Sequence, residues 1–299
     1  MITPVLQSNR AAWFILAGMM TLGFSDNLVR VVSTDSSLWQ FHLIRGLMVI
    51  AALLIAAALG AGAAWPFKPL NVLGRSALQA GAMLIYFGCL AILPIGVVVA
   101  GLFTAPLFVL IIGVVFQGKR VGVIRGSAVG LGFIGALLVI RPDPNALDLI
   151  SFLPVLAGLL YAIGAIATRT WCEGETTLTL TLWFFAVLML FGAIGVMVLP
   201  SGGTTGAQGF ALRGWMPVTV DMLGWYVVLA IGAVIGIGCI FKGYQIGEAG
   251  SVAVFEYTLL VFASFWAWML WGETVPALGL VGMGTIAAAG IIIAVRSDA

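Results

Sequence analysis

Apolar stretches of about 20 residues, the length of helix that crosses a bilayer, follow one another along almost the whole chain. Interruptions by Pro, Gly or clustered charges divide the chain into ten such stretches. A helix satisfies its own backbone polar groups in lipid, and the chain lacks the alternation of a barrel strand. We therefore predict an all-α integral membrane protein with ten transmembrane helices, at residues 11–31, 38–60, 72–93, 95–117, 122–140, 149–171, 177–199, 221–243, 249–271 and 275–295.

The composition excludes a soluble globular protein. Of 299 residues, 62% are hydrophobic and 8% are charged, whereas soluble domains carry roughly a quarter of charged residues. The net charge of +2 includes no basic run, so nucleic acid is not an expected partner. The three cysteines are odd in number and widely spaced, and the single histidine has no metal-binding spacing. We expect no disulfide framework, no metal and no cofactor.

The basic residues are distributed unevenly between the predicted loops. Cytoplasmic loops collect Lys and Arg, and Arg30, Arg141 and Arg213 lie on one side of the predicted spans, while Arg45 lies within a span. The other nine lie on the opposite side: Arg10, Lys68, Arg75, Lys119, Arg120, Arg125, Arg169, Lys242 and Arg296. We therefore expect both termini in the cytoplasm and the protein in the cytoplasmic (inner) membrane.

The two halves of the sequence resemble each other weakly. A polar break at residues 141–145 separates five spans from five, and setting Gly118 on Gly272 places Phe103-Thr104 on Tyr257-Thr258. A copy with an odd number of spans must insert in the opposite direction, as in the inverted repeats of secondary transporters. We predict a first five-helix repeat at 11–141 and a second at 149–296. A compositional likeness between Gly-rich apolar halves is the alternative.

Four short segments carry a resemblance to a known family. They are Gly23-Phe24-Ser25-Asp26-Asn27, Phe41-His42-Leu43-Ile44-Arg45, Thr104-Ala105-Pro106-Leu107-Phe108 and Trp271-Gly272-Glu273. In this order and spacing the chain resembles the EamA-type members of the drug/metabolite transporter superfamily, and within them the YddG-type exporters. The resemblance implies export of aromatic and other neutral amino acids. The chain departs from the pattern at Lys119, where Glu is usual, and at Leu260, which lacks the counterpart of Pro106.

Ionisable groups inside the predicted spans are the first candidates for function. A charge near the bilayer centre costs roughly 2.5 to 3.5 kcal/mol, so it indicates a partner, a wet cavity or a function. Asp26 and Arg45 lie at similar depth and can pair, with Asn27 and His42 near by in the sequence. This group is interpreted either as an outer gate or carboxylate site, or as a buried pair that joins two helices. Glu256 is the candidate for binding a substrate ammonium or exchanging a proton, unless Lys242 neutralises it.

A substrate cavity is predicted from polar and aromatic residues near the span centres. Gln79, Met83 and Tyr86 share one helical face at i, i+4 and i+7. The other candidates for the lining are Phe103, Thr104, Tyr161, Trp183 and Tyr257. For each aromatic residue, contact with lipid is the alternative.

These observations predict a secondary transporter and not an enzyme. It would export amino acids or related small metabolites by alternating access, with a small-molecule substrate and membrane lipid as partners and a monomer as the expected state. Two Gly-rich segments, 113–120 and 130–135, lack the strand that a nucleotide-binding loop requires, and Gly126 and Gly130 have a spacing typical of helix packing. One competing interpretation is an integral-membrane enzyme acting on a lipid or lipid-linked substrate, but the acidic residues are too scattered to form its active site. The other is a channel or passive scaffold.

Overall fold

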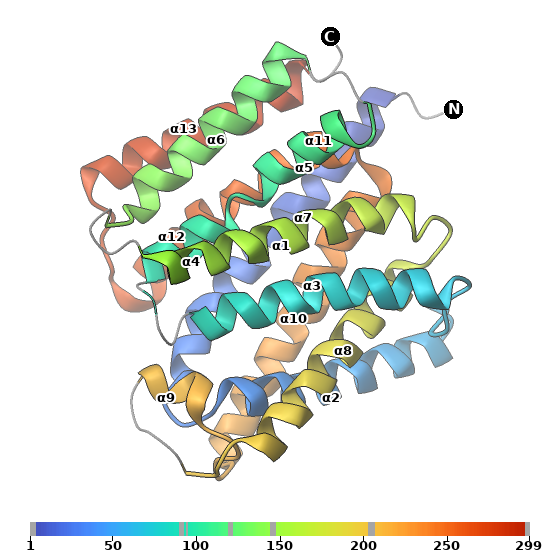
Figure 1. The fold of residues 1–299 in the computed structure, drawn as a ribbon, viewed down its shortest axis with the longest axis vertical. Coiled ribbons are helices and arrows are strands. Elements are labelled where there is room, and N and C mark those ends of the chain that lie inside the picture. Colours follow the sequence, from blue (N-terminus) through green and yellow to red (C-terminus); the bar gives the residue numbers. More distant parts are fainter. Residues whose placement is uncertain are drawn as a thin grey trace.

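The computed structural model describes residues 4–89, 93, 95–118, 122–143, 148–202 and 207–296. Every regular element in these residues is a helix (Figure 1). The elements are α1 (Pro4–Ser33), α2 (Leu38–Ala58), α3 (Pro69–Cys89), α4 (Ile95–Leu102), α5 (Ala105–Val115), α6 (Val123–Ile140), η2 (Leu149–Phe152), α7 (Leu153–Thr170), α8 (Thr177–Val198), α9 (Ala207–Leu212), α10 (Val220–Ile246), α11 (Ala249–Val252), η3 (Ala253–Tyr257), α12 (Thr258–Trp271) and α13 (Ala277–Arg296).

Each of the ten predicted spans corresponds to helical structure. Within the described residues, nine segments are long and apolar enough to cross a membrane. The remaining span is α3, which has 21 residues, and its Asn71, Arg75 and Gln79 lower its apolar character. The all-α membrane class is confirmed at this level. The short helix α9 lies in a loop where no helix was predicted.

Two of the spans are broken near their middle. The fourth span consists of α4 and α5, which are separated at Phe103 and Thr104, and Pro106 lies in the first turn of α5. Proline lacks the N–H that would continue the hydrogen-bond ladder of α4. The ninth span begins as α11, continues as the 3₁₀ helix η3 and becomes α12 at Thr258.

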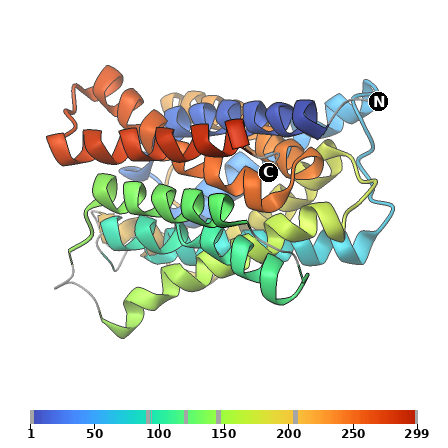
Figure 2. The same cartoon turned by 90° about the horizontal axis from the view of Figure 1, so that it is seen from above.

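Helices α6 and α13 run side by side at one edge of the bundle (Figures 1 and 2). A Cβ at Gly135 of α6 would lie 2.8 Å from the carbonyl oxygen of Gly282 on α13, so the small side chains permit this close approach. A Cβ at Gly126 or Gly130 would meet no atom within 4 Å. The prediction of a packing contact at those two glycines is therefore wrong.

Polar contacts define two opposite ends of the bundle. At the end that we call the Arg30 end, Arg30 forms an ion pair with Glu273, and the Nη1 to Oε1 distance is 2.7 Å. At the other, which we call the Glu248 end, Arg125 pairs with Glu248 at 2.7 Å. Helix α1 runs from one end to the other. Its Ala11 lies against Gly247, the residue before Glu248. Arg30 follows 19 residues later, which is about 28 Å along a helix.

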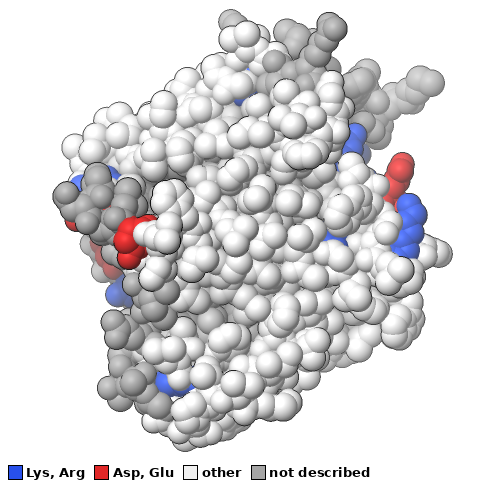
Figure 3. Space-filling view, viewed as in Figure 1, with Lys and Arg blue, Asp and Glu red and all other residues white. Residues whose placement is uncertain are grey.

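The surface agrees with a membrane-spanning bundle. Figure 3 shows most Lys, Arg, Asp and Glu side chains of one face at its two opposite edges, with an uncharged band between them. Arg30 and Arg125, which the charge pattern placed on opposite sides, form their ion pairs at opposite ends of the bundle. Which end faces the cytoplasm remains a prediction from the sequence. Lys119, Arg120 and the side chain of Arg296 lie outside what the structure describes.

One basic residue differs from its predicted place. Arg75 was counted among the cytoplasmic loop residues, but it is fully buried within α3. Its guanidinium is held by groups from α7, α8 and α10, since it donates to Thr168 and Leu180 and lies on the ring of Phe241. The hydropathy pattern did not indicate this burial, because Arg75 lies only six residues from the start of the helix.

Candidate functional site

A cavity of about 740 Å³ lies between the helices. This volume is within the range of about 300 to 1,000 Å³ that is typical of small-molecule sites. The wall is mainly aliphatic and aromatic, with a small number of polar residues, which are Asp26, Asn27, Arg30, Ser33, Arg45, Tyr86, Tyr161 and Glu256. An apolar chamber with a few separate polar groups suits an amphipathic solute.

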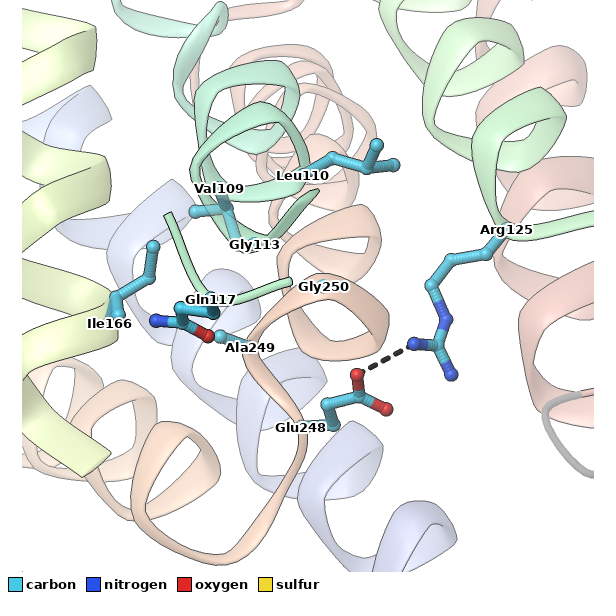
Figure 4. A pocket seen from close by; sticks show the side chains of 9 residues that line it. All are labelled: Val109, Leu110, Gly113, Gln117, Arg125, Ile166, Glu248, Ala249 and Gly250. Atoms are coloured by element: carbon cyan, nitrogen blue, oxygen red, sulfur yellow. Dashed lines mark hydrogen bonds and ion pairs between the residues drawn. The ribbon is translucent and has the colours of Figure 1, made fainter. Parts of the chain in front are cut away.

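The cavity is displaced towards the Arg30 end. On α1 its lining extends from Met19 to Arg30 and Ser33. A small pocket of about 20 Å³ lies at the Glu248 end, where the side chain of Arg125 reaches Glu248 at the start of α11 (Figure 4). The described residues thus form a large chamber near one end of the bundle and, at the other end, a small pocket beside an ion pair.

Arg45 of α2 presents a guanidinium to the cavity. Its Cζ lies 4.2 Å from the centre of the Phe41 ring and 5.5 Å from that of Phe185, and Nη2 is 3.5 Å from Nδ1 of His42. Asp26 is exposed on the same cavity wall. No ion pair within 4.0 Å joins these two side chains among the described residues. The predicted direct pair is therefore not formed, and both charges remain available to a ligand.

Glu256 is buried in η3 and lines the cavity. The hydroxyl of Tyr161, on α7, donates to its Oε1 at 2.8 Å. The hydroxyl of Tyr244, on α10, lies beside the same carboxyl group. The alternative in which Lys242 neutralises Glu256 is not supported, because the described residues hold no such ion pair. Side chains two residues apart on a helix do not share a face, so Lys242 points away from the side on which Tyr244 lies.

Eight of the thirteen predicted site residues line the cavity. They are Asp26, Asn27, Arg45, Met83, Tyr86, Phe103, Tyr161 and Glu256. Asn27 also donates to the carbonyl oxygen of Ala263 at 2.9 Å, which joins α1 to α12 beside the cavity.

The other five lie outside the lining. Gln79 is buried against Gly164 of α7, and Thr104 donates to the carbonyl of Gly101 in its own turn. His42 is buried behind Arg45, with an edge contact to Phe87. Trp183 donates to the carbonyl of Ala64 and contacts Trp65. Tyr257 is packed behind Phe103.

Several lining residues were missed by the sequence analysis. Phe184, Phe185 and Leu188 of α8 line the cavity, whereas the prediction chose Trp183 on that helix. The α8 segment is apolar on all sides, so its sequence carries no signal for which face is turned inward. Phe210 of α9 was missed because α9 itself was not expected.

The two helix breaks meet beside the cavity. Phe103 at the first break and Tyr257 at the second stack with ring centres 5.8 Å apart and an interplanar angle of 22°. Aligning the two halves of the sequence had placed these residues on each other. Broken helices at the interface of two halves are typical of the binding region of secondary transporters.

The fold is shared with a solved structure. A crystal structure of a protein superposes with a TM-score of 0.71 and covers 96% of this chain and 98% of its own. The sequence identity is 15%, so this likeness concerns the fold alone.

Known relatives are membrane transporters by name. A riboflavin transporter of Rhizobium johnstonii is 25% identical over 294 residues, which cover 95% of this chain and 90% of that protein. The pseudopaline exporter CntI of Pseudomonas aeruginosa is 25% identical over 216 residues, which cover 71% of this chain and 70% of that protein. No family model matches the chain. With the apolar helical bundle, these similarities support a multi-pass membrane transporter of a small molecule, and they favour transport over catalysis.

Proposed function

We propose that the protein is a secondary transporter for small solutes that combine an aromatic or aliphatic body with an amino group and a carboxylate. Aromatic and other neutral amino acids are the first candidates, and export is the direction of transport. The observation that supports this proposal is that Arg45 and Asp26 both line the cavity and form no direct ion pair with each other. Membership of the drug/metabolite transporter superfamily, on the motifs given above, is part of the proposal.

The recognition chemistry follows from the positions of the charges. A guanidinium matches the two oxygens of a carboxylate, and Arg45 is oriented by the rings of Phe41 and Phe185. Asp26 or Glu256 receives the ammonium group. Aromatic side chains such as Tyr86 contact the apolar body of the solute.

Alternating access uses the two five-helix halves, 11–141 and 149–296, as the moving units. The ion pairs at the two ends both join one half to the other, because Arg30 and Arg125 lie in the first half and Glu273 and Glu248 in the second. In the present state the cavity lies towards the Arg30 end, which the charge pattern assigns to the outside. Opening of the Glu248 end gives access from the cytoplasm in the inner membrane.

A second candidate substrate is a larger planar heteroaromatic solute such as riboflavin. It is favoured by the riboflavin transporter that aligns with 95% of the chain and by the aromatic wall of a cavity of about 740 Å³. Riboflavin has no carboxylate, so its transport would not depend on the charge of Arg45. The two candidates are therefore distinguishable by one variant.

The test is solute counterflow in proteoliposomes that contain the purified protein. Labelled tryptophan, leucine and riboflavin are offered separately, and Arg45→Gln is compared with Ser127→Ala, an exposed position on α6. Saturable amino acid flux that falls in Arg45→Gln and persists in Ser127→Ala supports the proposal. Saturable riboflavin flux alone selects the second candidate, and the absence of saturable flux for every solute overturns both.

A further inference from the structure

We infer that Arg75, with Ser76, Gln79 and Thr168, forms a second carboxylate-binding site, which the transported solute occupies when the bundle opens at the Glu248 end. The inference rests on the proposed function, because it assigns the site to the same solute. It gives a role to a buried polar cluster that the present cavity does not use.

The cavity wall on α3 continues into this cluster. Arg75, Gln79, Met83 and Tyr86 are spaced by four, four and three residues, so they share one helical face. Met83 and Tyr86 line the cavity, while Gln79 is buried one turn and Arg75 two turns further towards the Glu248 end. A solute moving along this face would leave the cavity and meet Gln79 and then Arg75.

The guanidinium of Arg75 has no acidic partner. Nε donates to Oγ1 of Thr168 at 2.9 Å, Nη1 donates to the carbonyl oxygen of Leu180 at 3.2 Å, and Cζ lies 3.6 Å from the centre of the Phe241 ring. Nη2 is buried without a hydrogen-bond partner. The described residues place no carboxylate within 4.0 Å of it. A buried cation is costly unless it is paired. Binding of an anion to Arg75 would offset that cost.

Neighbouring polar atoms on the same helix are also unsatisfied. Oγ of Ser76 and both polar atoms of the Gln79 amide are buried without a hydrogen-bond partner. Leaving a buried polar group unpaired costs about 1 to 3 kcal/mol, and native structures contain few such groups. The Ser76 hydroxyl and the Gln79 amide nitrogen therefore have donors that are free to bind a carboxylate.

A polar route joins the cluster to the cavity along α7. Tyr161, Gly164 and Thr168 are spaced by three and four residues and share a face that packs against α3. Tyr161 hydrogen-bonds Glu256 on the cavity wall, the side chain of Gln79 occupies the space over Gly164, and Thr168 binds Arg75. From Tyr161 to Thr168 is about 10 Å of helix. Separation of α3 from α7 would therefore extend the cavity directly to Arg75.

Two arginines inside the bundle have similar aromatic surroundings. Arg45 lies on the rings of Phe41 and Phe185 and is open to the cavity. Arg75 lies on the ring of Phe241 and is closed off from the cavity. A carboxylate bound by Arg45 in one state would be bound by Arg75 in the other, and the amide of Gln79 and the hydroxyl of Ser76 supply further hydrogen bonds.

The test measures access of charged thiol reagents to Ser76→Cys, in a background where Cys89, Cys172 and Cys239 are replaced by Ala. Ala80→Cys is the matched control, because Ala80 is also fully buried on α3 but belongs to the hydrophobic core. In proteoliposomes, and relative to each reagent's rate with a free thiol in solution, an anionic methanethiosulfonate should modify Ser76→Cys about tenfold faster than its cationic analogue, because a local positive charge concentrates anions. A tryptophan gradient that drives turnover should increase the rate, and Ala80→Cys should stay unreactive.

Adding Arg75→Gln to Ser76→Cys should abolish the anionic preference, whereas Arg75→Lys should keep it. Size-exclusion profiles and melting temperatures identify variants that do not fold, and Arg75→Lys then carries the comparison. If Arg75 is only a structural contact between helices, Ser76→Cys stays unreactive or reacts without charge preference, which overturns the inference. A failure of the proposed function can be distinguished from a failure of this inference. The first appears as absent amino acid flux in the unmodified protein, whereas the second is read from the reagent selectivity at Ser76→Cys, which is measurable without flux.

Discussion

Replacing Arg45 by Gln removes a cavity-lining guanidinium and keeps a polar side chain in its place. The described residues give Arg45 no ion-pair partner, so the substitution leaves no acidic group stranded at contact distance. Its contacts are the rings of Phe41 and Phe185 and the imidazole of His42. The substitution therefore acts on ligand binding more than on folding.

The magnitude follows from the hydrogen bonds that a carboxylate would lose. A hydrogen bond to a charged group contributes about 1.5 to 3 kcal/mol, and the Gln amide retains one weaker contact. A net loss of about 2 to 3 kcal/mol raises the dissociation constant about 30- to 140-fold. The cation–π contact with Phe41 contributes about 0.5 to 2 kcal/mol, so the melting temperature should fall only modestly.

The assay compares tryptophan with tryptamine, which lacks the carboxylate, for the unmodified protein, Arg45→Gln and Arg45→Lys. Tryptophan affinity should fall by the factor above in Arg45→Gln and recover partly in Arg45→Lys, while tryptamine affinity should change less than threefold. An equal loss for both ligands, or an unchanged affinity for tryptophan in a folded Arg45→Gln protein, would refute the assignment of Arg45 to a carboxylate.

Three further predictions concern the groups around the cavity and the helix contacts. Tyr161→Phe removes the hydrogen bond to Glu256 and should lower the free energy of unfolding by about 1 to 3 kcal/mol. Tyr257→Phe removes an unpartnered hydroxyl and should leave thermal unfolding nearly unchanged. Equal losses in the two variants would contradict the geometry. Gly135→Leu forces α6 away from α13 and should lower the melting temperature by the equivalent of about 1 to 3 kcal/mol, while Gly126→Leu, with open space around it, should not. The side chains of Arg125 and Glu248 are 22% and 37% exposed, so a double-mutant cycle on this pair should give a coupling energy below about 1 kcal/mol in unfolding. A coupling energy of several kcal/mol would show that the ion pair is too stable to break readily when this end of the bundle opens.

Individual residues show why some of the site was predictable. Asp26, Arg45 and Glu256 were found from the sequence because a charge within an apolar span is costly and therefore conspicuous. Met83 and Tyr86 were found from their helical spacing. Gln79 satisfied the same spacing but lies beyond the end of the cavity, because a shared face does not indicate how far along the helix a cavity extends.

The helices themselves follow from the sequence alone. A bilayer requires apolar helices of about 20 residues, and the chain has no other way to satisfy its backbone in lipid. The tertiary structure decided which faces meet. In a uniformly apolar helix such as α8, lipid and protein interior are equally apolar, so periodicity carries no information about the inward face. For that reason only the folded chain places Phe184 and Phe185 at the cavity, leaves Asp26 and Arg45 unpaired beside it, and buries Arg75 between α7, α8 and α10.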